Sequence, residues 1–164
     1  MGLDSESDTA SDIDSTGVAV SDDEYVPSPT TWVREQVEKI ESTGTTRAVS
    51  VMDRPVVMLT MRGARTGAIR KVPLMRVEHE GVYAAVASKG GTPEHPQWYA
   101  NLQANPRITL QDDTRSWEAL AREVTGAERD AWWDRCVAAY PAYADYQTRT
   151  DRLIPVLLLE PLVD

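Results

Sequence analysis

The hydrophobic and polar positions of this chain follow first a helical and then a strand-like period. In the stretch TTWVREQVEKIESTG, Val33, Val37 and Ile40 recur at helical spacing with charged residues between them, and Gly44 stands where a helix would end. The apolar runs VVMLTM, KVPLMRV and VYAAVAS come next, separated by the turn-forming stretches RGARTGAIR and EHEG. This pattern predicts one amphipathic helix followed by three antiparallel strands.

The second half of the chain predicts further helices and hairpins. HPQWYANLQAN predicts a short helix, RITLQ and SWEALAREV predict a hairpin, and RLIPVLLLE predicts a last strand with Pro155 at its edge or start. Thr125 followed by Glu128 is a capping-box pattern, which opens a helix that ends near Pro141. About six strands joined mostly by hairpins favour a mainly β fold with helices (α+β), a small six-stranded barrel with helices packed outside.

Charge is distributed unevenly along the chain. The formal net charge is −9, but eight of the 26 acidic residues precede Arg34, the first basic residue, which leaves 18 acidic against 17 basic residues. Residues 1–29 are rich in Ser and Asp and poor in large apolar side chains, so we expect a disordered acidic tail. Residues 30–164 are long enough for one domain with a hydrophobic core.

Composition also excludes several classes of protein and site. No positively charged segment leads into an apolar run near the start, and no apolar run reaches the roughly 18 residues of a spanning helix, so we expect a cytoplasmic protein without a membrane span. Cys136 has no partner for an internal disulfide, and His79 and His95 do not form a zinc motif, so no metal site is expected. The net acidity argues against nucleic acid as a partner.

Basic residues nevertheless gather between Arg62 and Lys89, where six of them face only two glutamates, a local charge of +4. An anionic ligand would explain this charge, but strands and hairpin tips often carry solvated charge. The run Ser88-Lys89-Gly90-Gly91 follows a strand end, where glycines let backbone N–H groups approach an anion and the lysine adds a charge. The same run is also compatible with a plain turn.

Three tyrosines recur every three residues in AYPAYADYQ. In a helical segment Tyr140, Tyr143 and Tyr146 share one broad face, where their hydroxyls can line a pocket or their rings can pack in a core. Ser88 has no histidine in a triad arrangement, so an acyl-transfer nucleophile is not supported.

Four blocks taken together closely resemble the deazaflavin-dependent nitroreductase family, whose members are reductases that use coenzyme F420 on a split β-barrel. The blocks are RGARTGAIRKVPL, VASKGG, HPQWYANLQANP and YPAYADYQTRTDRLIPVLLLEP, and the resemblance covers roughly residues 52–161. It implies a split β-barrel of the kind that binds FMN in other proteins. It also implies a cofactor with a flat deazaflavin ring and a tail that carries a phosphate and several glutamates.

The resemblance further assigns positions around this cofactor. It implies that one set of residues contacts the anionic tail, namely Ala64, Arg65, Thr66 and Arg70, with Lys89, Gly90 and Gly91 near the phosphate. A second set surrounds the deazaflavin, namely Pro73, Met75, Val86, Ala87, Ser88, Gln97, Trp98 and Asn101. The substrate side is bounded by Met75, Tyr140, Tyr143 and Tyr146.

The function that the resemblance implies is F420H2-dependent reduction. A hydride would pass from the reduced deazaflavin to an electron-poor acceptor, which is an activated alkene or lactone, a quinone or a nitro compound. Ser88 and Tyr143 would hydrogen-bond this acceptor and stabilise the charge that develops on it. The nitroimidazole-reducing members have a Tyr where this chain has Met75, so nitroimidazole activity is not implied for this chain.

Two alternatives remain open from the sequence. The first is an FMN-binding split-barrel oxidoreductase, and the second is an F420-binding or storage protein without catalysis. The acidic tail stands where some relatives carry a membrane-seeking segment. Because its eight carboxylates would be repelled by an anionic leaflet, peripheral membrane contact is not expected.

Overall fold

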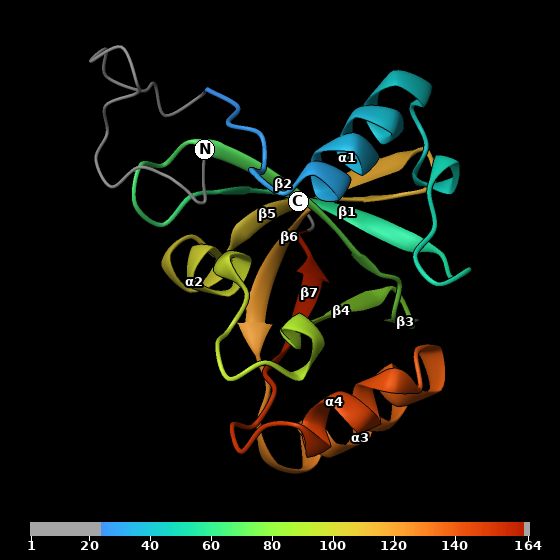
Figure 1. The fold of residues 1–164 in the computed structure, drawn as a ribbon, viewed down its shortest axis with the longest axis vertical. Helices are drawn as coiled ribbons and strands as arrows, with labels where there is room; N and C mark the ends of the chain where they lie inside the picture. Colours follow the sequence, from blue (N-terminus) through green and yellow to red (C-terminus); the bar gives the residue numbers. More distant parts are fainter. Residues whose placement is uncertain (1–23, 163–164) are drawn as a thin grey trace.

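The computed structural model describes residues 24–162, which form seven strands, four α-helices and two 3₁₀ turns (Figure 1). Their order along the chain is α1 (Thr31–Thr43), η1 (Thr46–Ala48), β1 (Val56–Arg62), β2 (Ile69–Met75), β3 (Glu78–His79), β4 (Val82–Val86), η2 (Lys89–Gly91), α2 (Gln97–Ala104), β5 (Arg107–Asp112), β6 (Arg115–Glu123), α3 (Gly126–Ala139), α4 (Ala142–Thr148) and β7 (Val156–Pro161). The helices and strands predicted from the hydrophobic pattern are therefore present.

All seven strands belong to one antiparallel sheet with the order β2-β1-β5-β6-β7-β4-β3. The predicted mainly β fold with helices outside is confirmed, but the predicted strand number of six is too small. The additional strand is β3, which pairs with β4 across the turn at Glu80 and Gly81. Both turn residues have positive φ, at 52° and 84°, as a two-residue hairpin loop requires, so the stretch read as a turn is itself a short hairpin.

The interior of the curled sheet holds the larger hydrophobic core. Val57, Leu59 and Met61 point into it from β1, since every second residue of a strand faces the same side. At one end of the barrel, Trp98 and Leu102 of α2 pack into this core. The opposite end, at the start of β1, is lined by the residues of a cavity that is described below.

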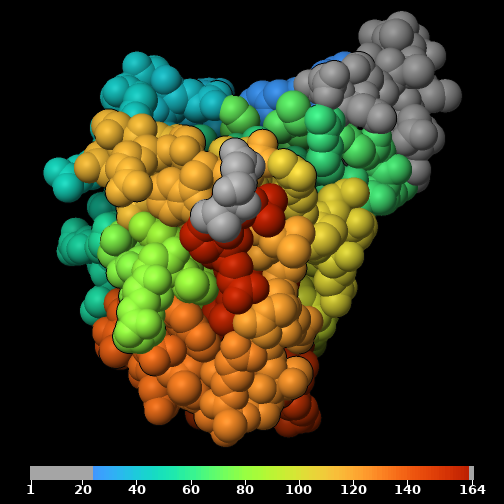
Figure 2. All heavy atoms as spheres, turned by 180° about the vertical axis from the view of Figure 1, so that it is seen from behind, coloured from blue at the N-terminus to red at the C-terminus, as the bar shows by residue number. Residues whose placement is uncertain are grey.

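The remaining helices pack on the outside of the sheet. Val37 and Ile40 of α1 contact Met58 of β1, as the predicted amphipathic stripe requires, and Gly44 ends this helix with φ 79°. Trp132 and Cys136 of α3 belong to a third cluster that covers the outer face of β4 and β7. Seen from behind, the orange atoms of α3 cover the lower part of the molecule, and the red residues of the chain's end appear as a narrow strip (Figure 2).

One local expectation is corrected by the structure. The side chain of Thr125 makes no capping hydrogen bond at the start of α3, so the predicted capping box does not form. Glu128 is drawn away from the helix end by Arg122, whose two guanidinium nitrogens donate to it at 3.0 and 2.9 Å. A bidentate arginine pair competes successfully for this carboxylate with a single backbone N–H.

The expected acidic tail falls largely outside the described residues, because residues 1–23 are not among them. Within the described part, Tyr25 forms a bridge with Ile69, and the N–H of Val26 donates to the Ile69 carbonyl at 2.9 Å. The structured region thus takes in residues that the sequence pattern assigned to the tail. No helix within residues 24–162 is both long and apolar enough to cross a membrane.

Candidate functional site

The turn between β1 and β2 is held in place by α2. The Ala64 N–H donates to Oδ1 of Asn101 at 2.9 Å, and the Asn105 side chain donates to the Gly63 carbonyl at 3.4 Å. Asn101 is 5% exposed, so its amide is committed to this turn. The contact fixes the backbone of Ala64 and leaves the neighbouring Arg65 exposed to solvent, where the predicted anionic tail would bind.

The loop after β4 adopts an unusual backbone conformation. Lys89, Gly90 and Gly91 all have positive φ, at 46°, 66° and 82°. For the lysine this left-handed conformation costs roughly 1–2 kcal/mol, which the surrounding contacts must offset. One such contact is visible at Gly91, where a Cβ atom would lie 2.6 Å from the Tyr146 carbonyl oxygen. The loop is therefore pressed directly against α4.

Arg152 holds the same loop from its other side. Its guanidinium donates to the carbonyl oxygens of Ala87, Ser88 and Thr92 at 3.1, 2.8 and 2.9 Å, and it contacts Nδ1 of His95 at 3.0 Å. Burial lowers the pKa of this arginine, which remains charged at any physiological pH. The sequence pattern does not point to Arg152, because about 60 residues separate it from its partners and no local motif marks it.

The three tyrosines form one aromatic cluster around α4. The hydroxyls of Tyr140 and Tyr146 are 2.9 Å apart and hydrogen-bond each other. The ring of Tyr143 lies edge-on to Tyr140 at 5.0 Å between centroids. Tyr143 is 5% exposed, and its hydroxyl makes no hydrogen bond to any residue within 24–162. Burial raises its pKa, so Tyr143 is a protonated phenol whose O–H donor is not used by any residue within 24–162.

Met75 and Val86 belong to the same cluster as these tyrosines. Met75 is the last residue of β2, and Val86 is the last residue of β4, so the two strand ends meet the aromatic face of α4. Pro73 is buried in β2, which is an edge strand, as expected for a residue without a backbone N–H. The structure thus brings together the residues predicted for the substrate side.

Other predicted contacts have a different position. Trp98 is 9% exposed and packs into the barrel core, while Gln97, the first residue of α2, is exposed. Thr66 caps its own turn by accepting a hydrogen bond from the Ala68 N–H at 3.1 Å. Trp98 therefore supports the predicted site through packing, and Asn101 supports it through the turn that it holds.

The basic stretch between Arg62 and Lys89 contains both compensated and uncompensated cations. Lys71 pairs with Glu41, and Arg76 pairs with Asp112 at 2.9 Å, so these cations are already compensated. By contrast, Arg65 and Lys89 are exposed and have no hydrogen bond or ion pair with any residue described. The uncompensated cations lie on the β1–β2 turn and on the loop after β4, which are two segments predicted to bind the anionic cofactor.

Comparison with known proteins identifies the family. The family model of the F420H(2)-dependent quinone reductases matches residues 32–161. The chain belongs to this family. Its members depend on F420H2, so the chain is an F420-dependent oxidoreductase and coenzyme F420 is its cofactor.

Individual relatives agree with this assignment. A Mycobacterium tuberculosis protein named as an F420H(2)-dependent quinone reductase is 34% identical over 107 residues, which are 65% of this chain and 90% of the relative. A solved F420-H2 dependent reductase is 56% identical, with a TM-score of 0.63, and the match covers 68% of this chain and 99% of that one. A structure described as a domain-swapped dimer is 57% identical, with a TM-score of 0.65, and the match covers 81% of this chain and all of that one.

The described residues fit a cofactor with a flat ring and an anionic tail. Two exposed cations without protein partners, Arg65 and Lys89, are available to the tail. Met75 and Val86 offer an apolar surface next to the tyrosine cluster. The predicted F420 cofactor is confirmed by the family, and the FMN alternative is not.

Proposed function

We propose that this enzyme reduces a planar, electron-poor small molecule, with quinones as the first choice among the acceptors. The family and its named relatives support reduction by F420H2. The observation that carries the proposal for the site is the Tyr143 phenol, which is buried, protonated and without a partner among the described residues. It lies in one cluster with Met75 and Val86, beside the loop that bears Ser88.

When bound, the reduced cofactor supplies the hydride. The protein's own contribution is to orient the acceptor and to stabilise the negative charge that develops on its oxygen. Tyr143 donates a hydrogen bond to that oxygen. Ser88 donates a second one, since its hydroxyl has no partner within residues 24–162 while its carbonyl is held by Arg152. Tyr140 and Tyr146 are less available, because each hydroxyl already contacts the other.

Cofactor binding is proposed to depend on the two uncompensated cations. The backbone of Lys89 is held in a left-handed conformation in the loop that Arg152 and Gly91 anchor, so its exposed side chain extends from a fixed point of the loop. Arg65 is presented by the turn that Asn101 holds. Together they bind the phosphate and the carboxylates of the F420 tail, and they keep the affinity sensitive to salt.

Fluorescence titration with F420, beside FMN at the same ionic strength, tests the binding part of the proposal. We expect F420 to bind much more tightly than FMN. Lys89→Ala should weaken F420 binding about tenfold, the usual cost of one charge-assisted contact. Lys39→Ala is the matched control, because Lys39 is an exposed lysine of α1 outside the proposed site. Unchanged affinity in Lys89→Ala would show that the loop does not bind the cofactor.

Anaerobic oxidation of F420H2 with a panel of quinones, activated lactones and nitro compounds tests the catalytic part. We expect turnover with quinones, and Tyr143→Phe should lower kcat by roughly a hundredfold with little change in F420 affinity. Tyr25→Phe, a tyrosine beside Lys71 and outside the site, is the control. F420 binding without turnover of any quinone would contradict quinones as the first choice among the acceptors. An unchanged kcat in Tyr143→Phe would remove this phenol from the mechanism.

A further inference from the structure

A cavity of about 430 Å³ opens at the end of the barrel opposite α2. Its lining comes from the beginnings of β1, β4 and β6, the last residue of β5 and the segments next to them. These segments meet at one end of the antiparallel sheet. The lining residues are Thr46, Arg47, Pro55, Val56, Arg76, Tyr83, Asp112, Asp113, Arg115 and Trp117. None of them belongs to the proposed cofactor or acceptor site.

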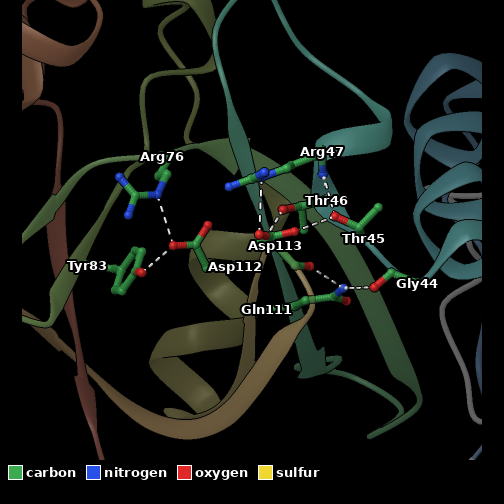
Figure 3. Close-up of polar contacts among 9 residues, drawn as sticks. All are labelled: Gly44, Thr45, Thr46, Arg47, Arg76, Tyr83, Gln111, Asp112 and Asp113. Atoms are coloured by element: carbon green, nitrogen blue, oxygen red, sulfur yellow. Dashed lines mark hydrogen bonds and ion pairs between the residues drawn. The ribbon is translucent and has the colours of Figure 1, made fainter.

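The two carboxylates of this cavity are already compensated by the protein (Figure 3). Asp112 accepts hydrogen bonds from Arg76, at 2.9 Å, and from the hydroxyl of Tyr83. Burial and the bond to Asp112 raise the pKa of Tyr83 to about 12, so this phenol remains a donor at neutral pH. Neither the carboxylate nor the phenol is available to attract a cation.

Asp113 is compensated in the same way by residues from the α1–β1 connection. The Thr45 hydroxyl donates to it at 2.7 Å, and Nε of Arg47 lies 3.1 Å away. Figure 3 shows these side chains gathered on Asp113, next to the group around Asp112. The cavity therefore has two neutralised acid–base groups in its wall and no unpaired carboxylate among its lining residues.

Arg115 is the arginine of the cavity that lacks an acidic partner among the described residues. Its guanidinium lies 5.6 Å from the centroid of the Trp117 ring, and that ring lies 5.6 Å from the Tyr83 ring. Pro55 and Val56 extend the apolar wall. The indole nitrogen of Trp117 is buried without a hydrogen-bond acceptor within residues 24–162. One excess positive charge therefore stands beside two aromatic rings.

We propose that this cavity binds a small planar aromatic monoanion of the aryl carboxylate class. The ring packs against Trp117 and Tyr83, and the carboxylate accepts two parallel hydrogen bonds from Arg115. A single uncompensated arginine matches one negative charge, because Arg47 and Arg76, the other two arginines of the lining, already pair with Asp113 and Asp112. The volume is that of a site for a one- or two-ring ligand.

Isothermal titration calorimetry with 2-naphthoate tests this site, with 2-naphthalenemethanol as the neutral ligand of the same shape. We expect saturable binding of one 2-naphthoate per chain and at least about tenfold weaker binding of the alcohol. Arg115→Ala should weaken 2-naphthoate about tenfold or more, and Arg115→Lys should recover part of that loss because a charge remains. Arg135→Ala is the matched control, since Arg135 stacks on Trp132 at 4.8 Å outside the cavity.

Several outcomes would overturn the inference. These are the absence of saturable binding to the wild-type protein at millimolar ligand, equal affinity for acid and alcohol, and equal losses in Arg115→Ala and Arg135→Ala. The comparison of acid and alcohol uses the wild-type protein, so it does not depend on the folding of any variant. Saturating F420 should leave 2-naphthoate binding unchanged, and competition would place the ligand in the cofactor site instead. Arg115→Ala should bind F420 with unchanged affinity. A failure of this inference can therefore be distinguished from a failure of the proposed function.

Discussion

Gly91 and Tyr146 approach each other so closely that a Cβ atom at position 91 would lie 2.6 Å from the Tyr146 carbonyl oxygen and 3.0 Å from its Cα. Two segments predicted to bind different parts of the reaction complex, the loop after β4 and the tyrosine helix α4, are thus in direct backbone contact. Because the obstructing atoms belong to the backbone of α4, a side chain at position 91 has to displace the whole loop.

Gly91→Ala should therefore damage both stability and activity. We expect a loss of about 2–4 kcal/mol in the free energy of unfolding, from the strained φ of 82° and from overpacking against α4, together with a clear loss of F420H2 oxidation. Thermal unfolding and steady-state kinetics measure the two effects. Gly44→Ala is the control, because Gly44 has φ 79° and a Cβ at that position would meet no other atom within 4 Å. Equal stability losses in both variants would mean that the contact with Tyr146 is not important.

Arg152 offers a second test, of positioning and not of chemistry. Arg152→Ala removes the donors to the carbonyls of Ala87, Ser88 and Thr92, so the loop and its hydroxyl lose their fixed place. We expect kcat/KM to fall on the order of a hundredfold, since small displacements of orienting groups have effects of that size.

Arg152→Lys is the informative companion variant, because lysine keeps the charge but cannot reach three carbonyls in a planar fork. A partial recovery of kcat/KM is expected, with most of the remaining loss in kcat because Ser88 stays misplaced. Arg107→Ala, which breaks an exposed pair with Glu118, is the control for removal of an arginine. Full activity in Arg152→Ala would contradict the positioning role.

Helix α1 and the residues Arg152 and Lys89 show what the sequence could and could not predict. The period of Val33, Val37 and Ile40 and the apolar runs of the strands are local signals. They predicted the correct elements because the spacing of apolar residues within an element determines which face is buried. The role of Arg152 depends on contacts with residues about 60 positions away, and the left-handed φ of Lys89 is imposed by such contacts. Neither feature leaves a trace in the local pattern.

The same limit explains the corrected details. Thr125 and Glu128 match a local capping rule, but Glu128 pairs with Arg122, which is also held by Glu160 of β7, 38 residues further along the chain. Blocks that resemble a family predict Tyr143 and Met75 in one site, and the structure puts them in one cluster. By contrast, the cavity around Arg115 is lined by one or two residues from each of several strands and loops, so no contiguous motif predicts it.

Alkaline pH should weaken the attachment of α2 to the barrel. The Tyr99 hydroxyl donates to Glu123 at 2.5 Å, and burial together with this bond raises the pKa of Tyr99 from 10.0 to about 12. A raised pKa means that folding favours the protonated phenol, so the contribution is complete below pH 10 and is lost as the pH rises to about 12. Melting temperatures between pH 8 and 12 should therefore fall less steeply for Tyr99→Phe than for the wild type.

The melting temperature of Tyr99→Phe should still fall somewhat as the pH rises, because Tyr83 is bonded to Asp112 and also has a pKa of about 12. Tyr25→Phe provides the comparison for a tyrosine that bonds no carboxylate. Parallel curves for wild type and Tyr99→Phe would show that the bond to Glu123 does not contribute to the pH dependence.

Met75 is the position at which acceptor choice can be tested most directly. The resemblance to the nitroreductases implies a tyrosine here in the members that reduce nitroimidazoles, whereas this chain has a flexible thioether against Tyr140, Tyr143 and Tyr146. Met75→Tyr adds a rigid ring and a hydroxyl to this cluster. We expect the ratio of kcat/KM for a nitroimidazole to that for a quinone to rise about tenfold, the usual value of one added hydrogen bond to a developing charge.

The size of the new side chain has to be separated from its chemistry. Met75 is only partly buried, so the cluster can take up the larger ring with a stability loss of about 1–3 kcal/mol, which thermal unfolding measures. Met75→Phe adds the ring without the hydroxyl, and Met75→Leu conserves the apolar volume. If the ratio rises equally in the Phe and Tyr variants, the aromatic wall decides the acceptor. A rise in Tyr alone assigns the choice to the hydroxyl, and no change in either variant removes position 75 from acceptor selection.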